Sequence, residues 1–299
     1  MEMQSLVIGG DGLVGRQLCA DLRRRGEDFV ATTRQRETSG LFCDLADLDL
    51  VPFKARRFSR AYFCAAATDM AWCEAHARES DRINVTGTLA LLRHLGEKGC
   101  HTVFFSSSQV FDGETPLPDE DSFLNPLNRY GRQKASVETV IAAEGLPVAI
   151  LRIAKVLAPT PVGMFRKWFA ELSEGHGVRA ASNLSLAPVK VSDVSQAALC
   201  LGLTEAQGIW HYCSSDEMTY LEAVRLMARL CGFPEEKVEG EVLTEERVPR
   251  IFRHRYTAMR AQKVAEAFRL PIHPAHTLLE EIFAAFPSAP RMPGWGRGR

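Results

Sequence analysis

The stretch Leu6-Val7-Ile8-Gly9-Gly10-Asp11-Gly12-Leu13-Val14-Gly15 decides the fold of this chain. An apolar run typical of a buried strand passes directly into a glycine-rich turn, and residues 13–25 then have the period of an amphipathic helix. The glycines at 10, 12 and 15 fit G-x-G-x-x-G, and those at 9, 12 and 15 fit G-x-x-G-x-x-G. Glycines in this context allow a tight turn and close approach of a pyrophosphate, which the helix N-terminus attracts. The unit therefore predicts a dinucleotide site.

Strand and helix patterns continue to alternate through the first half of the chain. We expect the strands at residues 5–8, 29–33, 41–43, 61–66, 103–106 and 148–153. A weak helix is expected to end at Pro52, and a long helix with apolar positions at Ile83, Leu89, Leu92 and Leu95 should follow the fourth strand. This alternation predicts an α/β fold with a Rossmann-type doubly wound parallel sheet.

The pattern loosens after about Pro159. Helices are expected at 165–172, 194–203, 220–231 and 277–286, with a strand at 208–213. We expect residues 1–158 to form the dinucleotide-binding domain. Residues 159–286 should form mainly a smaller α+β substrate-binding lobe, with segments near 189–215 returning to the large sheet. The tail at 287–299 is rich in Pro, Gly and Arg and is expected to be flexible.

Composition excludes several classes of protein. A chain of 299 residues with 46% hydrophobic content can bury a large core, and its net charge of -1 gives no field for nucleic acid or an anionic membrane. No apolar stretch reaches the roughly 20 residues of a membrane span, and no secretory signal precedes the first strand. Eight cysteines without a CxxC pair favour a cytoplasmic protein with reduced thiols. His273 and His276 lack a further ligand nearby, so no metal site is expected.

The end of the second strand indicates which dinucleotide binds. It reads Thr32-Thr33-Arg34-Gln35-Arg36, where an NAD-selective site would carry Asp or Glu for the adenosine 2′-hydroxyl. Arginine suits a 2′-phosphate through forked, charge-assisted hydrogen bonds. We therefore favour NADP(H), with NAD(H) and a merely solvated loop arginine as alternatives.

A tyrosine and a lysine share one helix face in the run Tyr130-Gly131-Arg132-Gln133-Lys134. Bringing a phenol from a pKa of ~10 to ~7 requires about 4 kcal/mol. One cation ~4 Å away, at an effective dielectric of ~20, supplies energy of that order. Three serines at 106–108, at the exit of the fifth strand, offer a hydroxyl for a substrate carbonyl. Loop capping by the serines and an ordinary half-buried tyrosine are the alternatives.

These motifs resemble those of the extended short-chain dehydrogenases/reductases, and within them the dTDP-4-dehydrorhamnose reductase group. Besides the glycine turn, the resemblance rests on Ala65-Ala66-Ala67-Thr68, Asn84-Val85-Thr86-Gly87-Thr88, Val110-Phe111-Asp112-Gly113, Asn125-Pro126-Leu127-Asn128-Arg129-Tyr130 and Leu151-Arg152-Ile153. It covers nearly the whole chain and is strongest to about residue 155.

The resemblance implies roles for individual residues. Tyr130 would donate a proton, Lys134 would bind the nicotinamide ribose and lower the tyrosine's pKa, Ser107 would be the catalytic hydroxyl, and Asn84 would support the active-site water and backbone. The residues expected at the cofactor are Gly9, Gly12, Leu13, Val14, Gly15, Thr33, Arg34, Arg36, Asp44, Leu45, Ala65, Ala66, Ala67, Tyr130 and Lys134. Those expected at the substrate are Thr68, Met70, Ser107, Ser108, Tyr130, Arg166 and Lys190, with Lys167 as a further choice.

Departures from the family pattern narrow the activity. Ser108-Gln109 stand where the superfamily's dehydratases have Asp-Glu, and Gln109 stands where the fucose-synthase type has cysteine. In the second lobe, Asn183-Leu184 replaces the Asp-Gln that the reductases usually show, which leaves the substrate's identity open.

The resemblance therefore implies an NADPH-dependent reductase of a nucleotide-linked 4-keto-6-deoxysugar, with a nucleotide-diphosphate sugar as its partner and a homodimer as one oligomeric option. Three alternatives remain open. They are an NAD-dependent nucleotide-sugar epimerase, a non-catalytic NADP-binding regulator resembling the β subunit of methionine adenosyltransferase, and a reductase of a carbonyl that is not a sugar.

Overall fold

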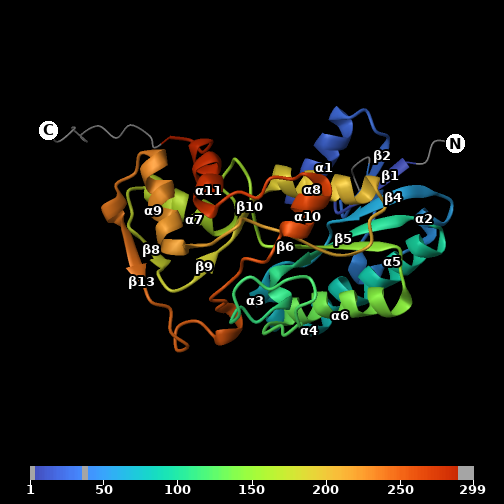
Figure 1. Ribbon diagram of the computed structural model, residues 1–299, viewed down its shortest axis with the longest axis horizontal. Coiled ribbons are helices and arrows are strands. Elements are labelled where there is room, and N and C mark those ends of the chain that lie inside the picture. The colour runs from blue at the N-terminus through green and yellow to red at the C-terminus, as the bar shows by residue number, and fades with distance from the viewer. Residues whose placement is uncertain (1–3, 36–39, 289–299) are drawn as a thin grey trace.

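A parallel seven-stranded sheet forms the centre of the larger part of the molecule (Figure 1). The computed structural model describes residues 4–35 and 40–288, so nearly all of the tail predicted at 287–299 lies outside the described residues. The strand order is β11-β6-β5-β4-β1-β2-β3. The strands are β1 (Gln4–Ile8), β2 (Phe29–Thr33), β3 (Leu41–Phe42), β4 (Phe58–Phe63), β5 (His101–Ser107), β6 (Val148–Ile153) and β11 (Gly208–Tyr212). The order reverses between β1 and β4, which places a crevice at their carboxyl ends and confirms the predicted fold class.

Helices cover both faces of this sheet (Figure 1). On one face lie α1 (Leu13–Arg24), α8 (Val191–Leu203) and α10 (Gln262–Phe268), and on the other lie α2 (Val51–Lys54), α5 (Thr88–Glu97) and α6 (Arg129–Glu144). Leu18 and Ala197 pack on the first face, and Leu92 and Val137 pack on the second. The apolar side chains of β1 alternate between the two clusters, as a strand buried on both sides requires.

A smaller lobe has its own core. Three two-stranded sheets pair β7 (Lys155–Leu157) with β10 (Pro188–Lys190), β8 (Val178–Ala181) with β13 (Val238–Glu241), and β9 (Ser185–Leu186) with β12 (Met218–Thr219). Helices α7 (Gly163–Ser173), α9 (Tyr220–Cys231) and α11 (Ala275–Ala284) pack around Phe165, Met227 and Leu279. Besides α8 and β11, α10 also lies against the large sheet, so more of the second half returns there than the predicted segment at 189–215.

The region after β4 differs from the prediction. The strand predicted at 61–66 runs from Phe58 to Phe63. Cys64 makes one more bond to β1, from its backbone N to the carbonyl of Ile8 at 2.9 Å, and the backbone of Ala67 already bonds to the side chain of Asn84. The predicted long helix is interrupted: α3 (Met70–Ala75) and α4 (Ala77–Asp81) lead into a π-helical segment (Arg82–Gly87) before α5. A π-helical turn inserts one residue and commonly occurs at functional sites.

A helix was predicted to end at Pro52. Instead, Pro52 lies in the first turn of α2. Proline is tolerated there because the first N–H groups of a helix have no partner within it. The residues before it form a 3₁₀ turn (Leu45–Asp47), which Asp44 caps by accepting a hydrogen bond from the backbone N of Ala46, at 3.0 Å.

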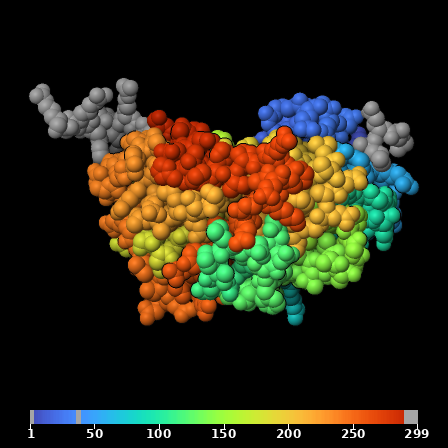
Figure 2. Space-filling view, viewed as in Figure 1, coloured from blue at the N-terminus to red at the C-terminus, as the bar shows by residue number. Residues whose placement is uncertain are grey.

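A segment of the second half of the chain also contacts the loop that follows β5. This crossing segment, around residues 249–262, contains the 3₁₀ turn Arg250–Phe252. In Figure 2 the orange and red surface of the second half of the chain meets the green surface of the first half. The backbone N of Tyr256 donates to the carbonyl of Gly113 and that of Arg260 to the carbonyl of Pro118, both at 2.9 Å. The crossing segment therefore lies over the carboxyl-terminal edge of the sheet, where β5 ends.

Within residues 4–35 and 40–288, no helix combines the length and the apolar character that crossing a membrane requires. All eight cysteines are free thiols.

Candidate active site

The glycine turn packs so closely that side chains at Gly9 and Gly15 would not fit. Gly9 has a φ of 85°, and a Cβ on Gly15 would lie 2.1 Å from the carbonyl oxygen of Gly9. Helix α1 begins directly after Gly12, whose own Cβ would meet only that same oxygen, at 3.4 Å. The N-terminal N–H groups of α1 thus face a space free of side chains, as a bound pyrophosphate requires. The turn fits the dinucleotide that its sequence predicts.

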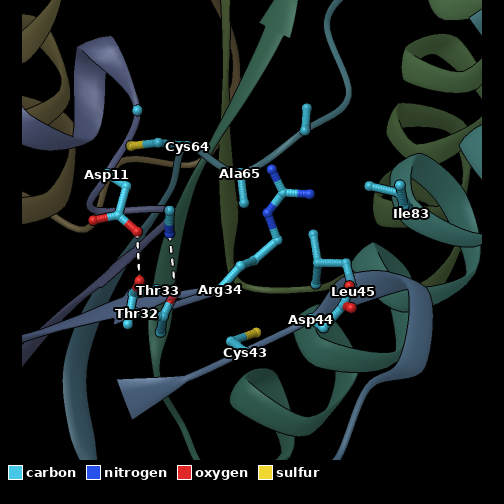
Figure 3. Close-up of a pocket in the computed structure, with 13 residues that line it drawn as sticks. Asp11, Thr32, Thr33, Arg34, Cys43, Asp44, Leu45, Cys64, Ala65 and Ile83 are labelled. Atoms are coloured by element: carbon cyan, nitrogen blue, oxygen red, sulfur yellow. Dashed lines mark hydrogen bonds between the residues drawn. The ribbon is translucent and has the colours of Figure 1, made fainter. Parts of the chain in front are cut away.

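A pocket of about 250 Å³ extends from this turn to the ends of β2 and β3 (Figure 3). Of the predicted cofactor residues, it is lined by Gly9, Gly12, Thr33, Arg34, Asp44, Leu45, Ala65 and Ala66. The side chain of Arg34 reaches into the middle of the pocket (Figure 3). The pocket therefore joins three predicted motifs that lie far apart in the sequence.

The other predicted cofactor residues lie elsewhere or outside the described residues. Leu13, Val14 and Gly15 form the first turn of α1, and Ala67 hydrogen-bonds with Asn84. Arg36 lies outside the described residues. The pocket also contains residues that we did not predict, of which Asp11 and Thr32 are polar.

Ser107, Tyr130 and Lys134 meet at the carboxyl end of β5. Ser107 is the last residue of β5, and the other two lie in the first turns of α6. Tyr130 and Lys134 are 9% and 3% exposed, and the Ser107 side chain lies close enough to Tyr130 to lower the pKa of its phenol. The Nζ of Lys134 donates to the carbonyl of Phe105 at 2.7 Å and lies 5.8 Å from the centre of the Tyr130 ring. The three predicted catalytic side chains are thus adjacent.

Burial is the largest influence on the pKa values of both Tyr130 and Lys134. It raises the pKa of Tyr130, and the Ser107 side chain opposes that rise. The pKa of Tyr130 therefore lies above its ordinary value, and the predicted lowering is wrong as a net result, because the cost of burying a phenolate exceeds the stabilisation that its neighbours give. Burial also lowers the pKa of Lys134 to about 8, against the opposing effect of the Glu138 carboxylate.

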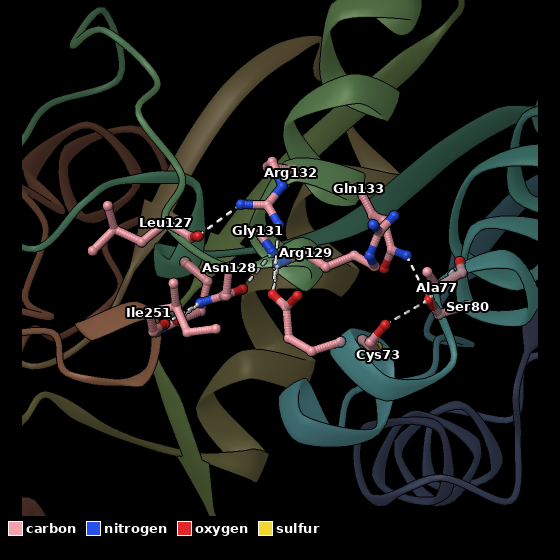
Figure 4. Close-up of polar contacts among 12 residues, drawn as sticks. Cys73, Ala77, Ser80, Leu127, Asn128, Arg129, Gly131, Arg132, Gln133 and Ile251 are labelled. Atoms are coloured by element: carbon pink, nitrogen blue, oxygen red, sulfur yellow. Dashed lines mark hydrogen bonds and ion pairs between the residues drawn. The ribbon is translucent and has the colours of Figure 1, made fainter. Parts of the chain in front are cut away.

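Asn84 lies in the π-helical segment and is fully bonded. Its Oδ1 accepts from the backbone N of Ala67 at 2.8 Å, and its Nδ2 donates to the carbonyl of Ala67 at 2.9 Å and to Oε1 of Gln133 at 2.7 Å. Gln133 in turn donates to Ser80 at 2.9 Å and to Asp81 at 2.7 Å (Figure 4). This chain of amides ties the loop after β4 to the helix that carries Tyr130.

The start of α6 is locked against the turn that holds the serines. A Cβ on Gly131 would lie 2.0 Å from the carbonyl oxygen of Gln109, so only glycine permits this approach. Asn128 caps the helix by accepting from the backbone N of Gly131 at 2.8 Å. Its Nδ2 donates to Gln109 Oε1 at 2.7 Å and to the carbonyl of Ile251 in the crossing segment at 3.2 Å (Figure 4). The distance between Tyr130 and Ser107 is thereby fixed.

Sequence reasoning missed a buried ionic cluster behind the site. Glu138 accepts from the Ser106 hydroxyl and from Nη2 of Arg152, the latter at 2.6 Å. Arg152 also donates to Nε2 of His211 at 3.1 Å. Burial and then Arg152 lower the pKa of His211 to about 3, which keeps this imidazole neutral and able to accept. Two sequence signals were available: a carboxylate one turn beyond Lys134, and a charged residue within the apolar strand β6.

The predicted substrate residues are less closely grouped. Thr68 is exposed, Met70 opens α3, and Ser108 is buried in the turn after β5. Arg166 and Lys167 are exposed on α7. Lys190 is engaged in an ion pair with Glu281, with its Nζ 2.6 Å from the carboxylate. Their roles toward a substrate stay predictions.

Comparison with known proteins gives a family match over most of the chain. The family model of the RmlD substrate binding domain matches residues 3–287. The chain is 28% identical over 293 residues to a dTDP-4-keto-6-deoxy-D-glucose reductase of Streptomyces niveus, covering 93% of this chain and 96% of the relative. It is also 25% identical over 294 residues to methionine adenosyltransferase 2 subunit beta of Xenopus tropicalis, covering 90% and 84% of the two chains.

Among solved structures, the chain is similar to a dTDP-4-dehydrorhamnose reductase from Bacillus anthracis in complex with NADP. The TM-score is 0.82 at 18% identity, and the match covers 94% of this chain and 99% of the other. This likeness supports the fold described above.

Proposed function

The chain belongs to the RmlD substrate binding domain family, a family of NAD(P)-dependent reductases of the extended short-chain dehydrogenase/reductase type, and from this premise we propose that it reduces a nucleotide-linked 4-keto-6-deoxysugar with NADPH. The membership confirms the resemblance found in the sequence motifs. The observation that carries the proposal is the gathering of Ser107, Tyr130 and the buried Lys134 where β5 ends and α6 begins.

The side chains divide the chemistry as follows. A bound reduced nicotinamide supplies a hydride to the carbonyl carbon. The hydroxyl of Ser107 donates a hydrogen bond to the carbonyl oxygen, and Tyr130 transfers its phenolic proton to that oxygen as the alkoxide develops. The raised pKa of Tyr130 keeps the phenol protonated until then, and the Lys134 ammonium stabilises the phenolate that forms. Net consumption is one hydride and one proton per carbonyl.

NADP(H) is the proposed dinucleotide, with NAD(H) as the alternative. Arg34 is placed in the pocket to bind a 2′-phosphate, and the Bacillus anthracis relative carries NADP. The smaller lobe, which is built from parts of residues 159–286, would hold the nucleotide sugar, because the segment around residues 249–262 links it to this edge of the sheet. A sugar substrate is supported by the name of the Streptomyces relative.

The test is reduction of dTDP-4-keto-6-deoxyglucose with NADPH. The reaction is measured by the loss of absorbance of the reduced nicotinamide, and the sugar product is identified by chromatography. Tyr130→Phe is expected to lower turnover by a factor of about 10³ or more while NADPH still binds. Tyr62→Phe is the control, since Tyr62 is buried in β4 beneath α8. Turnover by Tyr130→Phe at the rate of the unchanged protein would refute the assignment.

A second candidate is a regulatory subunit, favoured by the similarity to methionine adenosyltransferase 2 subunit beta. It is distinguished by co-purification with a methionine adenosyltransferase catalytic subunit, together with no turnover on any keto-sugar in the presence of either dinucleotide.

A further inference from the structure

A carboxylate stands at the end of β2, although β2 itself carries none. It belongs to Asp11 in the glycine turn. The hydroxyl of Thr33, the last residue of β2, donates to Oδ2 of Asp11 at 2.5 Å (Figure 3). The same hydroxyl oxygen accepts from the backbone N of Gln35 at 2.9 Å, so its proton is directed at Asp11. This pair places a carboxylate at the end of β2, where the residues that follow the strand in the sequence include Arg34 and no acidic residue.

Asp11 lies between two hollows. One is the 250 Å³ pocket with Arg34, and the other, of about 320 Å³, is lined on its basic side by Arg16 and Arg23 of α1. In the described part of the chain, the carboxylate of Asp11 forms no ion pair with any of these arginines. Its charge is therefore not neutralised by a direct partner, and three guanidinium groups lie nearby on either side.

The two charges favour different dinucleotides. A carboxylate at the end of β2 accepts hydrogen bonds from the adenosine ribose and repels a 2′-phosphate, whereas a guanidinium binds that phosphate. Proteins that select one dinucleotide carry one of these groups. This chain presents both within one pocket, the carboxylate from the glycine turn and the guanidinium from the loop after β2.

We propose that Asp11, held by Thr33, is the residue that limits the preference for NADPH and makes NADH a usable cofactor, with Arg34 acting in the opposite direction. The proposal deepens the proposed function, since it requires that this pocket binds the adenosine end of a nicotinamide dinucleotide. It does not require that the substrate is a sugar.

The experiment is titration of the full-length protein with NADPH and with NADH, followed by nicotinamide fluorescence, with the ratio of the two dissociation constants as the readout. Asp11→Asn keeps the size of the side chain and removes its charge. It is expected to shift the ratio about five- to tenfold toward NADPH, because one repulsive charge near the phosphate is lost in a partly solvated site. Arg34→Gln is expected to shift it by a similar factor toward NADH.

Two further variants separate charge from position. Thr33→Val leaves the carboxylate but removes the hydroxyl that holds it, and should shift the ratio toward NADPH by a smaller factor than Asp11→Asn. Asp49→Asn is the matched control outside the pocket, because Asp49 is an exposed carboxylate that accepts from the backbone N of Val51 at 2.8 Å. It should leave the ratio within twofold.

Raising the salt concentration should also reduce the difference between Asp11→Asn and the unchanged protein, since the effect is electrostatic. If Asp11→Asn changes both dissociation constants equally, or moves the ratio toward NADH, this inference is overturned while the proposed function stands. If the unchanged protein binds neither dinucleotide, the proposed function itself fails.

Discussion

At the scale of the residue, the ammonium of Lys134 serves the site and costs folding free energy. It is 3% exposed, and its one hydrogen bond runs to the carbonyl of Phe105. The folded pKa of about 8 lies below the ordinary value of 10.5. The unfolded chain therefore takes up this proton more readily, and the native state loses stability as the pH falls from about 10.5 to about 8.

Lys134→Met is expected to stabilise the protein at pH 7 by about 2 kcal/mol. The pKa difference corresponds to about 3 kcal/mol, and the lost hydrogen bond offsets about 1 kcal/mol of it. The gain should be absent at pH 10.5, because about half of the unfolded lysine is neutral there and the lost hydrogen bond outweighs the remaining cost of burying the charge. Urea unfolding at pH 7 and at pH 10.5 measures both quantities. Turnover of this variant should be lost, so a gain in stability and a loss of activity would appear together.

Glu138 is a positioning residue for Lys134, one helical turn away. Its carboxylate raises the pKa of that ammonium against the effect of burial. Glu138→Gln keeps one acceptor oxygen for Arg152, replaces the other oxygen by an NH2 group that can donate to the Ser106 hydroxyl, and removes the charge. The pKa of Lys134 should fall further below 8, so the alkaline limit of turnover should move to lower pH. A pH profile of kcat measures this shift.

The control for that profile is Glu144→Gln, which removes an exposed carboxylate from the same helix that pairs with Arg93. An unchanged alkaline limit in Glu138→Gln would show that its charge does not reach Lys134.

The sequence largely predicted which residues lie at the site. It did not predict how deeply they are buried or how burial changes their pKa values. Tyr130, Lys134 and Ser107 follow from motif spacing, and the structure brings them together. The direction of the pKa of Tyr130 depends on how deeply the ring is buried, which spacing does not reveal. Asp11 was missed because the acidic group was sought on β2, whereas here it comes from the turn that β1 supplies.

At the scale of the element, α6 carries the proposed catalytic residues Tyr130 and Lys134 on one face and is anchored at its N-terminal end. Tyr130, Lys134 and Glu138 are four residues apart and so lie along the same side. Gly131 lets this helix approach the turn after β5 until backbone touches backbone. The placement of the tyrosine thus depends on a residue that has no side chain.

Gly131→Ala is expected to displace the start of α6, because the new Cβ would lie 2.0 Å from the carbonyl oxygen of Gln109. We expect a loss of stability of about 3 kcal/mol and of most turnover. Gly145→Ala is the matched control at the other end of the helix. It has a φ of 59° and no neighbour within 4 Å, so it should cost about 1 kcal/mol and leave turnover unchanged. Thermal unfolding and kcat of both variants decide the matter.

Elements with complete local signals were predicted closely. Helix α9 was expected at 220–231 and occupies those residues, because a capping box at Thr219 and Glu222 begins it and Gly232 ends it. The interrupted helices after β4 were not predictable, since the π-helical segment is held by the contacts of Asn84 with Ala67 and Gln133. Such contacts join distant residues and leave no periodic pattern in the sequence.

At the scale of the whole molecule, two cores meet along the crossing segment. The smaller lobe is packed around Leu279, while the large sheet has separate clusters on its two faces. The hydrogen bonds from Tyr256 and Arg260 to the loop after β5 link the lobes through backbone. A destabilising substitution in the core of one lobe should therefore leave the other lobe folded. Dinucleotide binding should depend on the core of the large sheet.

Leu279→Ala should destabilise the smaller lobe by about 3 kcal/mol, the usual cost of a cavity left by a fully buried leucine. Dinucleotide affinity should stay within twofold, because the pocket at the glycine turn is built on the other core. Hydrogen exchange resolved by segment measures this, with faster exchange expected in α7, α9 and α11. Leu92→Ala, in the core beneath the sheet, serves as the comparison, and equal acceleration in both lobes would contradict separate cores.

The position of β11 in the strand order has a consequence for biosynthesis. This strand pairs with β6 along its whole length, and α8 before it is joined to α1 by a hydrogen bond from Ser195 to Asp21 at 2.5 Å, 174 residues apart. Until the ribosome has made the second half of the chain, β6 lacks its partner strand β11, and one face of the sheet lacks helix α8. A nascent chain that stops near residue 158 should therefore bind chaperones and resist purification, and co-expressing the missing half should rescue it.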